Sequence, residues 1–147
     1  MEDQDLGEVV FEHVHPAPRE LVFECMTTPE HLAQFFGPPG ISAPVELIEI
    51  DLRPGGVWNV TMVNDTTGEQ YPNLGECVEV VAPSRLVFRE PAVSGMQTAI
   101  KFIDLGDGTT RCVTTQTNVP AMFRSPEAQA GMYAAFGELD RYLATLT

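Results

Sequence analysis

The fold is decided by residues 125–146, which read SPEAQAGMYAAFGELDRYLATL. Apolar residues recur there at the i, i+3, i+4, i+7 spacing of one helix face: Met132, Ala135, Phe136, Leu139, Tyr142, Leu143 and Leu146. The polar residues between them are predicted to lie on a solvated face: Glu138, Asp140, Arg141 and Thr145. Ser125 is suited to cap the free amides of the first turn, and Pro126 is suited to the first helical position.

A helix of about 20 residues is roughly 30 Å long. Burying its large apolar side chains contributes on the order of 8–15 kcal/mol before the entropy cost of folding is counted. Such a helix is not stable alone, so the rest of the chain must supply an apolar surface of similar length.

The residues before this helix follow a period of two, which is typical of β-strands. Strands are predicted over residues 9–15, 45–52, 57–63, 70–81, 85–89, 97–104 and 109–117. Gly75 is predicted to form a bulge. Two short helices are predicted between the first two strands, one around Leu21, Val22 and Cys25 and one from its cap, Thr28, to Phe36.

Short turns join consecutive strands, which favours an antiparallel meander. Examples are Arg53-Pro54-Gly55-Gly56 and Gly106-Asp107-Gly108. We therefore predict an α+β fold in which a curved, antiparallel, seven-stranded sheet wraps around the long C-terminal helix.

Length and composition predict one domain, residues 8–147, after an acidic tail of residues 1–7. The formal charge of −13 argues against nucleic acid or an anionic membrane surface as a partner. No apolar run is long enough to insert into a membrane, and the acidic start of the chain does not resemble a signal peptide. Cys25, Cys77 and Cys112 are too scattered for a disulfide framework, so free thiols and a cytoplasmic location are expected.

Several short motifs, taken in order, carry a resemblance to a known family: residues 17–24 (APRELVFE), 28–38 (TPEHLAQFFGP), 52–56 (LRPGG), Tyr71-Pro72 with Gly75, 83–88 (PSRLVF) and 106–111 (GDGTTR). Their order and spacing resemble the START-like, or SRPBCC, superfamily, which has the helix-grip fold. Within it the chain is most similar to the group named after the activator of heat-shock protein 90 ATPase. The resemblance covers roughly residues 8–146.

The chain departs from this family at two places where tryptophan is common. It has Phe35-Phe36 in place of a tryptophan pair, and Gly131-Met132 in place of a glycine-tryptophan pair. Both changes keep apolar bulk, so they bear on the shape of a pocket rather than on the fold. The chain also matches a single domain of the two-domain co-chaperone that gives the group its name.

The resemblance implies a cavity between the sheet and the long helix, in which members of the superfamily bind lipids, sterols, hormones or polyketides. The candidate ligand-binding residues are Phe11, His13, His15, Phe35, Phe36, Trp58, Val60, Met62, Phe88, Thr114, Gln116, Met132 and Phe136. The alternative is that the apolar members of this set simply fill the core. Thr114 and Gln116 would orient a ligand's carbonyl or hydroxyl if they point inward, and would form a solvated strand face if they do not.

His13 and His15 lie two apart on a predicted strand and therefore share a face, so both imidazoles can reach one ligand or metal. A metal site needs a third and a fourth partner. The sequence offers none at a telling spacing, so no metal and no cofactor are predicted. A polar pocket wall and hydrogen-bonded or edge-exposed histidines stay open as alternatives.

No catalytic residue is predicted, because the chain has no nucleophile elbow and no glycine-rich phosphate loop. The leading hypothesis is a small, soluble, cytoplasmic domain that binds an apolar small molecule in the cavity. One alternative is a cyclase- or hydrolase-type enzyme that uses His13 or His15, with Glu12 or Glu79 as a partner, in that cavity. The other is a protein-interaction module, as the co-chaperone resemblance suggests, and a homodimer or a protein partner is compatible with each hypothesis.

Overall fold

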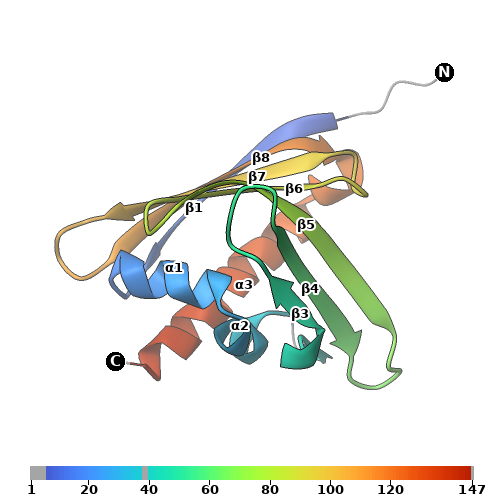
Figure 1. The fold of residues 1–147 in the computed structure, drawn as a ribbon, viewed down its shortest axis with the longest axis horizontal. Helices are drawn as coiled ribbons and strands as arrows, with labels where there is room; N and C mark the ends of the chain where they lie inside the picture. The colour runs from blue at the N-terminus through green and yellow to red at the C-terminus, as the bar shows by residue number, and fades with distance from the viewer. Residues whose placement is uncertain (1–5, 38–39, 147) are drawn as a thin grey trace.

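The computed structural model describes residues 6–37 and 40–146 of the chain. One curved, eight-stranded antiparallel sheet has three α-helices on its concave side (Figure 1). The elements in chain order are β1 (Leu6–His15), α1 (Arg19–Thr27), α2 (Pro29–Phe35), β2 (Ile41–Ser42), η1 (Val45–Leu47), β3 (Ile48–Ile50), β4 (Val57–Asn64), β5 (Gln70–Val81), β6 (Arg85–Glu90), β7 (Met96–Asp104), β8 (Thr110–Pro120), η2 (Ala121–Phe123) and α3 (Pro126–Ala144).

The strand order across the sheet is β1-β8-β7-β6-β5-β4-β2, and β3 also pairs with β4. Consecutive strands from β4 to β8 are therefore neighbours, as a meander requires, while β1 closes the far edge beside β8. The predicted α+β helix-grip architecture is confirmed. The additional strand is β2, whose two residues are too few to give a visible period of two.

Helix α3 begins as its sequence predicts. The Ser125 hydroxyl accepts a hydrogen bond of 3.1 Å from the Ala128 amide, and Pro126 occupies the first turn. Its buried side chains are Phe136, Leu139 and Leu143, of which the two leucines are fully buried. Leu146 was predicted on the buried face but lies beyond the end of the helix with 40% of its surface exposed.

Strand β1 alternates between the core and solvent. Phe11 and His15 are buried, whereas Val10 and Val14 are each 50% exposed on the opposite face. Of the predicted acidic tail, residues 1–5 lie outside the described residues, and Leu6 and Gly7 already pair with β8. The strand therefore begins earlier than its alternation suggested.

Gly75 was predicted to form a bulge, and this was wrong. It pairs directly with Trp58, and the register shift in β5 lies between Cys77 and Glu79. A Cβ atom at Gly75 would lie 2.9 Å from the Trp58 carbonyl oxygen and 3.4 Å from the Phe88 ring. Glycine is needed here because a Cβ atom would clash with the backbone carbonyl oxygen of Trp58.

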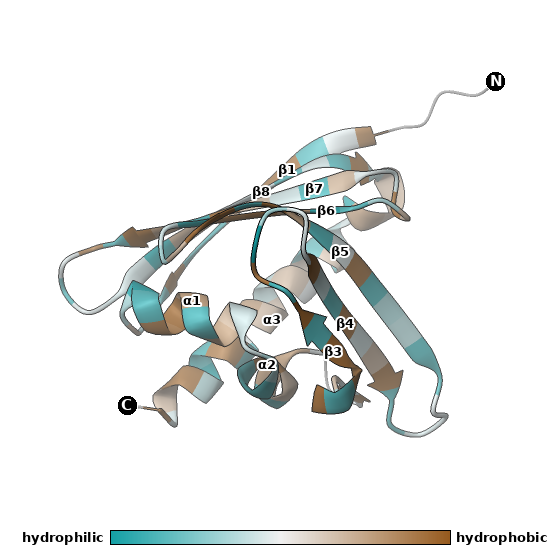
Figure 2. Cartoon of the chain, in the orientation of Figure 1, coloured by the Kyte–Doolittle hydropathy of each residue, from teal (hydrophilic) through white to brown (hydrophobic). Residues whose placement is uncertain are grey.

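The two short helices occur where predicted, but Thr28 makes no side-chain capping bond. The predicted strand over residues 45–52 is shorter than expected, because Val45–Leu47 form a 3₁₀ turn after Pro44 and the strand begins at Ile48. Strand β4 carries both brown and teal residues in Figure 2, and its burial alternates at Trp58 and Val60, which are buried, with Asn59 between them partly exposed. No helix in the described part of the chain is long and apolar enough to cross a membrane.

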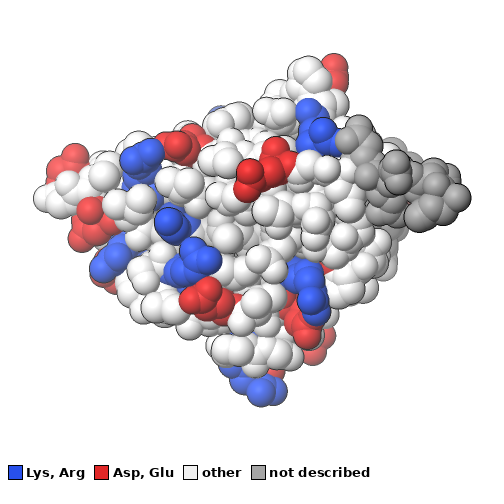
Figure 3. All heavy atoms as spheres, turned by 90° about the horizontal axis from the view of Figure 1, so that it is seen from above, with Lys and Arg blue, Asp and Glu red and all other residues white. Residues whose placement is uncertain are grey.

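The outer face of the sheet carries basic and acidic side chains interspersed (Figure 3). Several of them form ion pairs between strands: Arg111 with Glu12, Arg89 with Glu76, and Arg85 with Glu79. Three arginines on this face are thus paired with carboxylates, and acidic groups lie among the basic ones, unlike a continuous positive patch that binds nucleic acid.

Candidate functional site

A cavity lies between the concave face of the sheet, α2 and α3. Its volume is about 520 Å³, and a smaller hollow of about 220 Å³ near α2 shares four of its lining residues. The shared residues are Phe35, Phe36, Gly37 and Glu138. Strands β4 to β8 form the roof of the large cavity, and α3 forms its floor from Ala128 to Leu139.

The structure brings nine of the thirteen candidate ligand-binding residues to the wall of this cavity: Phe35, Phe36, Trp58, Met62, Phe88, Thr114, Gln116, Met132 and Phe136. The sheet residues among them are close together because alternate positions on neighbouring strands share one face. As ligand contacts, all nine stay predictions.

The other four candidates do not line the cavity. Val60 is fully buried in the main core, and Phe11 packs in a smaller core cluster with Phe136. His13 and His15 turn toward α3 instead. Period-two alternation correctly places these side chains on the inner face, but it does not distinguish a cavity wall from a filled core.

Trp58 is held in a defined position at the cavity wall. Its ring stacks on Phe88 at 4.8 Å between centroids, and its indole Nε1 donates a hydrogen bond of 3.0 Å to the Met26 carbonyl oxygen. Phe36 meets the same ring edge-on at 5.8 Å. These contacts fix the indole against the space that a ligand would occupy.

Polar groups in the cavity are few and come mainly from β7 and β8. Thr114 is buried, and the Gln116 amide donates a hydrogen bond of 3.3 Å to the Thr98 hydroxyl. Both predicted polar residues therefore point inward. Thr98 was not among the sequence candidates, although its place on the predicted strand over residues 97–104 could have indicated it.

Two carboxylates, Glu90 and Glu138, also line the cavity, and its described lining residues include no Lys, Arg or His. Burial raises the pKa of Glu90. Glu138 accepts from Arg141, whereas no described residue pairs with the Glu90 carboxylate. Glu90 was missed because it falls at a predicted loop, where alternation gives no signal.

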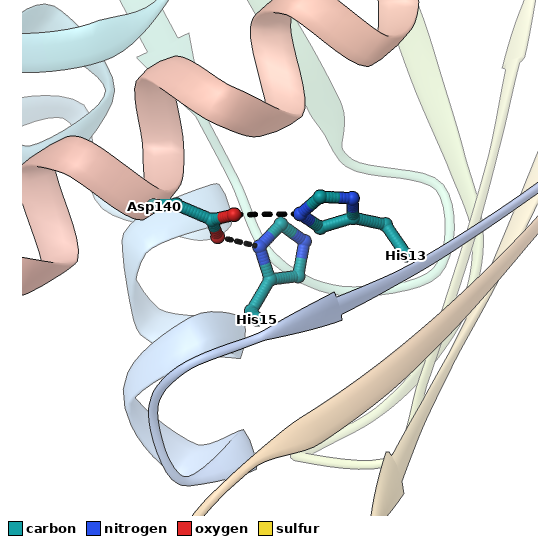
Figure 4. A group of neighbouring side chains, drawn as sticks. All are labelled: His13, His15 and Asp140. Carbon is teal, nitrogen blue, oxygen red and sulfur yellow. Dashed lines mark hydrogen bonds and ion pairs between the residues drawn. The ribbon is translucent and has the colours of Figure 1, made fainter.

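Outside the cavity, His13, His15 and Asp140 meet where α3 crosses β1 (Figure 4). The His13 Nε2 and His15 Nδ1 atoms each lie 2.6 Å from a different oxygen of the Asp140 carboxylate. A carboxylate oxygen accepts, so both imidazole nitrogens donate. Asp140 was predicted on the solvated helix face, and this was wrong, because the turn of α3 brings it over the edge strand.

His15 is fully buried, and burial lowers its pKa, although the hydrogen bond and the charge of Asp140 act in the opposite direction. Its other nitrogen, Nε2, has no hydrogen-bond partner among the described residues. Phe136 packs against both rings, with centroids 5.4 Å from His13 and 6.0 Å from His15. Since Phe136 also lines the cavity, it separates the histidines from that space.

Cys25, Cys77 and Cys112 are free and buried. Burial raises the pKa of Cys25 to about 11 and that of Cys112 to about 12. Both thiols therefore stay protonated near neutral pH, which makes them poor nucleophiles and poor metal ligands.

A family model described as "Activator of Hsp90 ATPase homolog 1-like protein" matches residues 16–144. Solved structures are similar over nearly the whole chain. A protein from Nitrosomonas europaea is 25% identical with a TM-score of 0.78, and the match covers 95% of each chain. An AHSA1-like protein from Aeromonas hydrophila is 19% identical with a TM-score of 0.82, over 95% of this chain and 93% of the other.

A third structure, from Rhodobacter sphaeroides, is 16% identical with a TM-score of 0.84, and the match covers 96% of this chain and 95% of the other. At the two lower identities the similarity shows the fold alone. No curated protein matches the sequence.

Proposed function

Because this chain belongs to the family of activator of Hsp90 ATPase homolog 1-like proteins, we propose that it binds an apolar small molecule in the cavity between its sheet and α3. The observation that carries the proposal is the cavity itself. Its volume of about 520 Å³ falls within the range of roughly 300–1,000 Å³ typical of ligand sites. Its walls are mostly aliphatic and aromatic, with a few polar groups, as such sites require.

The polar groups define which head group the ligand carries. Thr114, Thr98 and Gln116 offer hydroxyl and amide groups, Glu90 adds a carboxyl group without a described partner, and Glu138 adds one that is paired with Arg141. A carboxylate or phosphate head would meet no described cation at the wall. The ligand we propose therefore carries a neutral or cationic head, and the charge of −13 on the whole chain acts in the same direction.

The enzyme alternative depended on His13 or His15 in the cavity. Neither residue lines it, so the cavity supplies no imidazole for acid–base chemistry at a bound ligand. The three buried, free cysteines suit a reducing compartment, and we place the protein in the cytoplasm on that ground.

The test is a titration with Nile red, a neutral apolar dye, followed by dye emission and by the emission of Trp58, the sole tryptophan. Saturable binding is expected in the wild-type protein. Replacing Gly131, which lines the cavity, with leucine should abolish it, because the new side chain occupies the cavity.

Gly137→Leu is the matched control. Both glycines lie in α3, and a Cβ atom at either one meets nothing within 4 Å, but Gly137 does not line the cavity. Both substitutions should stabilise the helix by roughly 0.5–1 kcal/mol, so lost binding cannot be ascribed to unfolding. A linear dye response in the wild type, or equal binding by both variants, would favour the interaction-module alternative.

A further inference from the structure

Three groups that bind transition metals converge at the crossing of β1 and α3. The ligand atoms of His13, His15 and Asp140 all lie within 4.8 Å of one another. The histidines alone were too few for a site, and Asp140 supplies the third ligand from the other end of the sequence. We propose that these three residues bind one divalent transition-metal ion.

The donor set indicates the class of metal. Two imidazole nitrogens with one carboxylate suit Zn²⁺, Co²⁺, Ni²⁺, Cu²⁺ or Fe²⁺, whereas Mg²⁺ and Ca²⁺ prefer sites built from oxygen alone. With the carboxylate bound through one or both oxygens, the protein supplies three or four donors. Water completes the coordination.

A bound ion would replace the two hydrogen bonds between the histidines and Asp140. In a tetrahedral zinc site with bonds of about 2.0–2.1 Å, ligand atoms are about 3.3 Å apart. The two nitrogen–oxygen distances here are 2.6 Å, and all three ligand atoms lie within 4.8 Å of one another. The short pairs must therefore open, and any longer pair must close, to reach this spacing. Side-chain rotation of His13 and Asp140 can provide this, since both are partly exposed.

His15 can also adopt the proton arrangement that a metal requires. An ion at Nδ1 needs the ring proton on Nε2. No described group hydrogen-bonds to Nε2, so Asp140 alone holds the proton at Nδ1, and the proton at Nε2 of the metal-bound ring would have no described acceptor, which limits the affinity. Phe136 packs on both rings, and the fully buried His15 ring stays in place, so that His13 and Asp140 are the side chains that move when the site assembles.

Access is from one side. His15 is fully buried, while the side chains of His13 and Asp140 are 26% and 28% exposed. An ion therefore enters along the His13–Asp140 side and keeps its water ligands there. The site lies outside the cavity, so metal binding and binding of an apolar molecule are separable activities.

The test uses chelator-treated full-length protein titrated with ZnSO₄ by calorimetry near pH 7.5, and with CoCl₂ by absorption spectroscopy. We expect one ion per chain, a rise in melting temperature with Zn²⁺, and cobalt bands without thiolate charge transfer. Binding only to the folded chain raises stability by mass action. Here the bound ion would also cross-link β1 to α3.

His13→Gln and Asp140→Asn keep hydrogen-bonding side chains of similar size, so both should fold and bind zinc at least tenfold more weakly. His31→Ala is the control, because His31 bonds to the Tyr142 hydroxyl at 2.6 Å, outside the cluster. It should bind zinc like the wild type. The proposal is overturned if the wild type shows no saturable 1:1 binding of zinc, or if His13→Gln binds zinc as tightly as the wild type. It is also overturned if His31→Ala loses as much zinc affinity as His13→Gln, or if the cobalt spectrum shows a thiolate band.

Discussion

Glu90, at the end of β6, has a carboxyl group whose protonation is coupled to folding. Its burial raises its pKa above the ordinary value of 4.5, and burial is the sole cause. Such a group binds its proton more tightly in the folded chain than in the unfolded chain. The contribution of the protonated Glu90 carboxyl group to stability is therefore complete at pH values below its pKa in the unfolded chain. It is lost as the pH rises through its pKa in the folded chain.

Glu90→Gln should remove this dependence. We expect the variant and the wild type to have similar free energies of unfolding near pH 4, and the variant to be the more stable of the two at pH 7. Urea denaturation at both values measures the difference. Glu46→Gln, at an exposed position, is the control and should show no such change with pH. A difference for Glu90→Gln that is the same at both pH values would mean that water solvates this carboxylate fully.

Helix α3 has two different halves. Its N-terminal half borders the cavity through residues such as Ala128, Met132 and Ala135, whereas Leu143, near its C-terminus, is fully buried in the core. Leu139 belongs to both, since it is 1% exposed and also lines the cavity. The C-terminal half therefore anchors the helix, and this leaves the N-terminal half free to enclose space.

Leu139→Asp should unfold the protein or leave it without fixed tertiary packing. An unpaired buried carboxylate costs several kcal/mol, against a total stability of roughly 5–15 kcal/mol. Leu146→Asp, beyond the end of the helix, should change stability by less than about 0.5 kcal/mol. Thermal unfolding followed by circular dichroism compares the two. Similar melting temperatures for both variants would show that Leu139 does not anchor α3.

For ligand binding, the distribution of charge over the molecule matters more than the net charge. On the outer sheet face, Arg85, Arg89 and Arg111 form ion pairs with carboxylates. The described cavity wall holds Glu90 and Glu138 and no basic residue. Glu138 is paired with Arg141, so Glu90 is the carboxyl group at this wall without a described partner, and we expect its charge to act on any charged ligand that approaches.

Dodecylamine should therefore bind more tightly than dodecanol, and dodecanoate should bind most weakly. We expect the amine and the carboxylate to differ on the order of tenfold, which corresponds to about 1.4 kcal/mol. The difference should shrink at high salt because ions screen the potential. Displacement of Nile red at low and high NaCl concentration measures this order. Tightest binding by dodecanoate would contradict the charge argument but not the cavity.

Much of the fold follows from local pattern. The helical spacing in residues 125–146, the alternation of β1 and β4, and the Ser125 cap each depend on neighbours a few residues away. These features predicted a curved antiparallel sheet around a long C-terminal helix and the inward face of most candidate residues, and the family resemblance identified this arrangement with the helix-grip fold. Where local pattern was weak, as for β2 and η1, the prediction failed.

Contacts between distant residues were decided by packing in three dimensions. Asp140 reads as a solvated helix residue, yet it lies 125 and 127 positions from the two histidines that it binds. Gly75 reads as a bulge, yet a neighbouring carbonyl and ring require its lack of a side chain. Val60 and Met62 share one strand face, but one is sealed in the core and the other borders a cavity. Periodicity fixes the direction of a side chain, and the elements packed opposite it determine whether it meets a ligand, a metal-binding group or the core.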